Sequence, residues 1–184
     1  ASGQVQEALE PLEHCIAAYA NDPDSYAARV TAARALLELR RSAEAKKLLL
    51  DNLQQEGLTP RSTGWRDSLI LLGEILHSEG VVAITESRQL GWDNVDELKR
   101  REAVNKLAEA SELFTQALDR LSEAARRYPD DPSTTNVRYL VADARRHLAQ
   151  RPRVGLLSES IESRRIELAR QMHGQLEQAY QDFD

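Results

Sequence analysis

The chain has 184 residues, of which 41% are apolar, and 24 basic against 30 acidic side chains give it a formal charge of −6. Its eight glycines and six prolines are few for the turns of a β-sandwich or barrel, so an all-β fold is excluded. No apolar run approaches the roughly 20 residues of a membrane span, and the single cysteine, Cys15, excludes an internal disulfide framework. The composition therefore predicts a packed helical protein.

Apolar residues recur at three- and four-residue steps in the first part of the chain, which predicts helices. The predicted ranges are about 4–20, 25–39 and 43–55. Pro11 lies inside the first pattern, so we expect a kink or a helix start near it. Gly57 is placed to end the third helix.

A fourth helix is predicted over about 65–78, and it is apolar all round, which indicates cover on several sides. Residues 80–94 are ambiguous, because their β-branched run suits a strand that would have no partner. We therefore expect a helix or a loop in this segment rather than a strand. We expect a segment of about 80–99 to interrupt the helical array.

Asp93, three residues before Asp96, resembles the N-cap of a long helix over about 95–128. The later pattern predicts a helix over about 134–149, a turn at 150–153 and a last helix over about 155–180. The whole chain is thus expected to hold about seven helices in antiparallel pairs.

An internal repeat relates two distant segments. Five residue pairs are separated by 109 positions: Ala8 and Ala117, Leu12 and Leu121, Cys15 and Ala124, Tyr19 and Tyr128, Pro23 and Pro132. Small residues let helices approach closely, and larger residues nearby fill the gap between them. Helix pairs of this kind bury their apolar faces by stacking into a solenoid.

This pattern resembles the tetratricopeptide repeat (TPR) family. Ala117, Leu121 and Ala124, followed by Pro129, match the second helix of that repeat, and residues 32–49 resemble a complete unit. The sequence from Tyr128 onward is also similar to repeats of bacterial cell-envelope TPR proteins, such as outer-membrane assembly lipoproteins and Tol-Pal-associated proteins.

The resemblance implies an all-α fold, a right-handed α-α superhelix of degenerate repeats. We expect one such domain over 1–184, as a fragment of a longer protein. A location in the bacterial cell envelope or periplasm and one in the cytoplasm both remain open.

Motifs for catalysis are not evident in the sequence. The four histidines are far apart, the glycines are dispersed, and His14 beside Cys15 has the wrong helical spacing for a metal site. We therefore expect no enzyme activity, cofactor or metal. Residues 133–176 hold eight arginines against four acidic residues, but the whole chain is acidic, which disfavours nucleic acid. A solvated helix face and an acidic protein partner remain the alternatives.

The sequence thus favours a protein–protein interaction scaffold. In TPR-like packing, the first helix of each pair lines a concave groove that binds a peptide or protein. The resemblance places the following residues there: Arg34, Asp67, Glu74, His77, Asn136, Tyr139, Asp143, Arg146 and His147. Trp92, in the interrupting segment, is a further candidate contact. Self-association or an assembly role through the long helices is one alternative. A non-catalytic domain of a larger enzyme or regulator is another.

Overall fold

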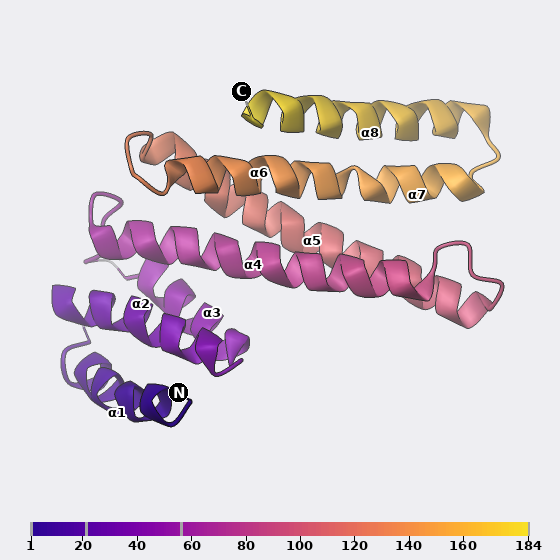
Figure 1. The fold of residues 1–184 in the computed structure, drawn as a ribbon. Helices are drawn as coiled ribbons and strands as arrows, with labels where there is room; N and C mark the ends of the chain where they lie inside the picture. The colour runs from indigo at the N-terminus through magenta and orange to yellow at the C-terminus, as the bar shows by residue number, and fades with distance from the viewer. Residues whose placement is uncertain (1, 21, 56, 184) are drawn as a thin grey trace. The chain divides into compact units, whose positions relative to one another are not determined.

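The computed structural model describes residues 2–20, 22–55 and 57–183 and contains two compact units, Ala1–Ile75 and Leu76–Asp184. Its described residues form eight α-helices and no strand (Figure 1). The helices are α1 (Ser2–Ala18), α2 (Pro23–Glu38), α3 (Ser42–Leu53), α4 (Thr63–Leu90), α5 (Glu97–Arg127), α6 (Thr134–Leu148), α7 (Gln150–Ser158) and α8 (Glu162–Phe183). The expected all-α class is confirmed. The boundary between the two units falls within α4.

In the first unit, α2 packs against both α1 and α3. Ala32 and Ala33 of α2 and Leu49 of α3 have no exposed surface, so small residues allow the close approach expected from the repeat. Asn52, also fully buried, donates a hydrogen bond to the Tyr26 carbonyl (2.9 Å). One polar side chain thereby joins α3 to α2 inside an apolar core.

The predicted helix start near Pro11 is wrong, because α1 begins at Ser2 and continues across the proline. A proline removes the hydrogen bond to the carbonyl four residues earlier. Here Pro11 and Glu7 are both exposed, so water can satisfy that carbonyl.

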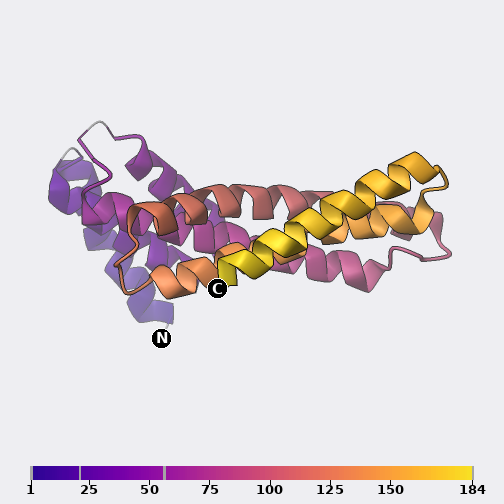
Figure 2. The same cartoon turned by 90° about the horizontal axis from the view of Figure 1, so that it is seen from above.

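In the second unit, α5 packs against α6, and α8 runs back along α7 and α6 (Figures 1 and 2). The core combines residues from four helices: Ala83 and Ile84 of α4, Leu107, Ala110 and Phe114 of α5, Ala144 of α6, and Val154 of α7. Gly80 allows α4 to approach α5, because a Cβ atom there would lie 3.0 Å from the Phe114 ring.

The segment expected to interrupt the array is mostly helical. Residues 80–90 continue α4, which ends before Gly91, a residue in the left-handed region with φ of 82°. The non-helical part is residues 91–96. The expected N-cap at Asp93 is wrong by three residues, since Asp96 accepts hydrogen bonds from the backbone N–H groups of Leu98 and Lys99.

Two further expectations are corrected after α6. Residues 150–153 are the first turn of α7 rather than a loop, and Pro152 fits there because the first N–H groups of a helix have no internal acceptor. The predicted last helix is in fact α7 and α8, separated by residues 159–161. Only Ala149 separates α6 from α7, and its backbone is nearly helical (φ −64°, ψ −16°).

Among the described helices, α4 is long and apolar enough to cross a membrane by length and composition, and an 18-residue stretch of it has a mean hydropathy of 1.4. In that stretch, 61% of the residues are buried inside the protein, and core helices meet the same criterion. The expected lack of a membrane span remains a prediction.

Candidate peptide-binding groove

Three neighbouring hollows lie along one side of the second unit, with volumes of about 770, 490 and 420 Å3. The first and second share Val104, Val154 and Ser158, whereas the second and third share Arg151, Pro152 and Gln171. They are therefore consecutive parts of one depression, here called the α5–α8 groove.

The walls of the groove are two helices with a third between them. On α5 the lining residues extend from Arg100 to Thr115 at steps of three and four, which is one face of a helix about 22 Å long. On α8 they extend from Leu168 to Gln178 in the same direction. The α7 residues follow in the opposite direction, so α7 lies between two helices that run parallel along the groove.

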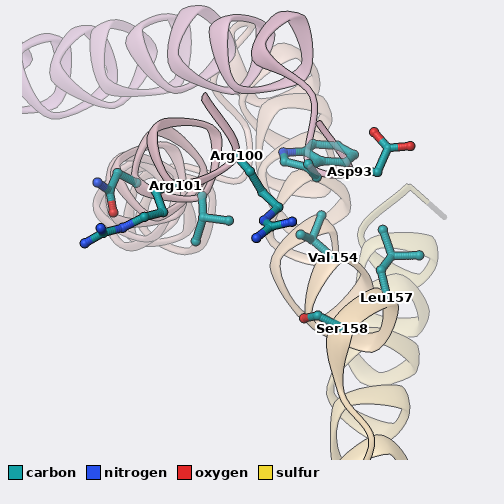
Figure 3. Close-up of a pocket in the computed structure, with 9 residues that line it drawn as sticks. Asp93, Arg100, Arg101, Val154, Leu157 and Ser158 are labelled. Carbon is teal, nitrogen blue, oxygen red and sulfur yellow. The ribbon is translucent and has the colours of Figure 1, made fainter. Parts of the chain in front are cut away.

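The first part of the groove lies beside the loop after α4. In Figure 3, Arg100 extends from α5 into the space beside α7, where Val154 and Leu157 lie, and Asp93 comes from the loop. Trp92 is half-buried against the core, and its Nε1 donates to Ser87 Oγ at 2.7 Å. This bond holds the indole at the groove. Trp92 thus packs back against α4, and it also lines the groove.

Three arginines, Arg100, Arg101 and Arg151, line the groove, and none forms an ion pair with a described side chain. Some other arginines of the unit do have carboxylate partners. Arg145 Nε lies 2.6 Å from Asp182 Oδ2, and Arg170 Nη1 lies 3.0 Å from Glu167 Oε2. The groove arginines are therefore available to carboxylates of a partner.

The same surface offers exposed apolar atoms and an open position on its wall. Val104 and Leu157 are 46% and 70% exposed. Gly174 of α8 lines the third hollow, and a Cβ atom there would meet nothing within 4 Å. The groove thus combines apolar contact area with cationic groups.

A separate buried polar cluster unites four of the residues expected to contact a partner. His77 Nε2 of α4 lies 3.0 Å from Asp143 Oδ2 of α6, and His147 Nε2 lies 3.4 Å from the same oxygen. Arg146 donates to Asp143 Oδ1 at 2.7 Å and lies 3.0 Å from His147 Nε2. The Phe114 ring stacks on His147 with 4.6 Å between ring centroids. The cluster therefore ties α6 to α4 and α5.

Burial decides the protonation of this cluster. It lowers the pKa of His77, and it lowers the pKa of His147 to about 4 although Asp143 opposes that shift. Burial by itself would raise the pKa of Asp143, but hydrogen bonds from Arg146 and nearby positive charge lower it overall. These shifts favour an ionised Asp143 between neutral His77 and His147.

The expected exposure of His77, Asp143 and His147 is therefore wrong, because each is less than a tenth exposed. Their side chains face one another in the core. Asn136 is exposed, and Tyr139, which is 54% exposed, packs its ring edge-on against Phe183 at 5.9 Å between centroids.

The remaining expected contacts lie in the first unit. Burial raises the pKa of Glu74, and the positive charge of exposed Arg34 acts against that rise. Asp67 pairs with the adjacent Arg66 at 2.8 Å. Their role in binding a partner remains a prediction.

Sequence reasoning missed most of the groove. Arg100, Arg101, Leu157 and Gly174 were not singled out, although the α5 residues lie on one helical face. The groove depends on the break between α7 and α8, which the apolar period alone does not reveal.

Among the described residues, no group of three His, Cys, Asp or Glu side chains is placed to hold a metal ion. A family model described as Tetratricopeptide repeat matches residues 1–59. The first 59 residues are thus similar to a tetratricopeptide repeat, and the described residues of the chain are all-helical, as in a TPR-like helical repeat protein. The TPR match fits a solenoid-like arrangement of helices, and TPR modules are in general scaffolds for protein–protein interaction. No curated protein and no solved structure matches the chain, so the cell-envelope resemblance remains a prediction.

Proposed function

We propose that this TPR-like protein is a non-catalytic interaction scaffold that binds a segment of a partner protein in the α5–α8 groove. The observation that carries the proposal is the continuity of the groove, with exposed apolar side chains beside three arginines that form no ion pair with a carboxylate among the described residues. Partner segments commonly enter such grooves through apolar anchors and pair with charges at the rim.

The groove is favoured over the expected concave face for a structural reason. On that face His77, Asp143 and His147 contact one another and are buried, so they offer little to a partner. The exposed Asn136 and Tyr139 line none of the three hollows. A binding surface needs contiguous accessible area, which the groove provides.

Gly174 permits a direct test, because it lines the groove and an added Cβ there would meet no other atom within 4 Å. Random peptides of about 16 residues, enough to span the groove as a helix, would be selected by display on the native chain and on Gly174→Trp. We expect enriched peptides to bind the native chain and to lose at least about tenfold in affinity on the variant.

Gly3 supplies the matched control, since its added Cβ is equally free and it lies in α1, which contributes no residue to the lining of the groove. Peptides should bind Gly3→Trp like the native chain. Enrichment that Gly174→Trp leaves unchanged, or no enrichment at all, would overturn the proposal.

Self-association through the last helix is a second candidate, because α8 exposes several large apolar side chains. Ile166, Leu176, Tyr180 and Phe183 are between 42% and 68% exposed. Sedimentation velocity over a range of concentrations tests it, and a strict monomer would exclude it.

A further inference from the structure

We infer that the segment that occupies the α5–α8 groove is an acidic amphipathic helix of about 15 residues. This inference rests on the proposed function, because it assumes that the groove binds a partner segment. It adds the secondary structure, the length and the charge of that segment.

The shape of the groove favours a helix. The lining face of α5 from Arg100 to Thr115 is about 22 Å long, the length of a 15-residue helix. A helix laid over α7 between α5 and α8 would contact both walls, as the added member of a helix bundle does. Strand addition, one common mode for an extended peptide, needs a free strand edge, and the described residues contain no strand.

The apolar part of the groove fits the spacing of a helical ligand. Val104 and Ala108 are one turn apart on α5, Leu157 projects from α7, and Leu168 lies on the opposite wall. Apolar residues at steps of three and four on the ligand would face these positions along its length. The hydrophobic contact therefore selects an amphipathic helix.

The charge of the groove favours acidic residues on that helix. Arg100 and Arg101 stand at the first part of the groove, and Arg151 borders both the second and third parts. Only two acidic residues, Asp93 and Glu112, line the three hollows. Carboxylates on the ligand would give these arginines ion partners that no described side chain provides, whereas a basic helix would be repelled.

A library of helical 15-residue peptides tests the charge and the conformation together. Every member keeps one Leu and Ala face, the other positions vary among Glu, Lys and Gln, and a companion library carries a central proline. We expect selection on the full chain to enrich acidic, proline-free members. Binding of these members is expected to fall at least about tenfold on Gly174→Trp.

Charge reversal then separates attraction by the groove arginines from the effect of the net charge of the protein. The double variant Arg100→Glu and Arg151→Glu should weaken the selected acidic peptide about tenfold or more by titration calorimetry and favour Lys-rich members instead. The matched control, Arg126→Glu with Arg138→Glu, changes the net charge equally at exposed arginines outside the groove. It should alter affinity by less than about twofold.

The other outcomes discriminate between the two proposals. Basic, neutral or proline-containing peptides that Gly174→Trp blocks would overturn this inference and leave the groove as a binding site. If no enriched peptide depends on Gly174, both proposals fail. If the chain forms a concentration-dependent dimer and Gly174→Trp dissociates it, the occupant of the groove is a second copy of the chain. That result would also overturn the inference of an acidic helical segment.

Discussion

Asn52 has no exposed surface, and all its polar atoms have partners in the first unit. Its Oδ1 accepts from Arg29 Nη1 at 3.2 Å, while its Nδ2 donates to the Tyr26 carbonyl and to Ser68 Oγ. Arg29 also donates to the carbonyl of Ala20, just beyond α1. The buried Asn52 amide thus holds the Arg29 guanidinium near the C-terminal end of α1, where the helix dipole favours positive charge.

We expect Asn52→Ala to lower the free energy of unfolding by about 2–4 kcal/mol, because it leaves a buried guanidinium and a buried carbonyl short of partners. Urea unfolding followed by circular dichroism measures the change. Asn105→Ala, at an exposed position of α5, is the control and should cost less than about 0.5 kcal/mol. A loss below about 1 kcal/mol for Asn52→Ala would contradict this account.

The histidine cluster predicts a decline in stability in mild acid. Unfolded histidine binds its proton near pH 6.5, while burial lowers the folded pKa of His77, and that of His147 to about 4. The unfolded chain therefore binds more protons as the pH falls from about 6.5, and the free energy of unfolding decreases until about pH 4. Below that range Asp143, whose folded pKa is lowered, loses its own stabilising contribution.

Replacing His147 with Gln should flatten this profile, with roughly 2 kcal/mol less change between pH 6.5 and 4 than in the native chain. His173→Gln, at an exposed position of α8, is the control and should leave the profile unchanged. Urea titrations at several pH values provide the comparison. Equal slopes for the native chain and His147→Gln would show that the cluster does not govern the acid response.

At the scale of single residues, the sequence placed Asp143 and His147 on one helix face, but their expected exposure was wrong. His147 lies one turn beyond Asp143, so a shared helix face was evident from the sequence. His77 joins them only because α4 passes this part of α6, a tertiary contact with no local signal. The same contact buries all three side chains.

At the scale of the elements, helix positions were predictable where apolar period and end signals agreed, as for α2 and α3. Two prolines misled the prediction in the same way. Pro11 lies within α1, and Pro152 lies in the first turn of α7, so neither ends a helix. The continuation of α4 over residues 80–90 depends on burial of Ala83 and Ile84 against α5 and α6, which local sequence does not reveal.

The close approach of α4 and α5 makes Gly80 a sensitive position. We expect Gly80→Ala to lower the free energy of unfolding by about 1–3 kcal/mol, because the new methyl group would lie 3.0–3.2 Å from the rigid Phe114 ring. Thermal unfolding measures the loss. Gly174→Ala is the matched helical control. The added methyl group has open space there, and alanine lowers the conformational entropy of the unfolded chain, so the free energy of unfolding should rise by about 0.5–1 kcal/mol. Similar effects at both positions would contradict close packing at Gly80.

At the scale of the whole molecule, the composition and the internal repeat were sufficient for the fold class. The TPR family model matches residues 1–59, the region where Ala32, Ala45 and Leu49 are fully or nearly fully buried as repeat packing requires. The candidate groove lies in the second unit, where the repeat pattern is weaker. Its walls depend on where α7 ends and α8 reverses direction. Tertiary packing of the helices sets this geometry, and no sequence motif encodes it.

The hydrogen bond from Trp92 to Ser87 has a practical consequence. Ser87 Oγ in turn donates to the Ala103 carbonyl at 2.6 Å, so the indole is fixed at the mouth of the groove while part of it still faces solvent. Its emission wavelength depends on how much water surrounds the ring. The chain therefore carries an intrinsic optical reporter at the groove, and with Trp65→Phe removing the only other indole, occupancy can be read without attaching a dye.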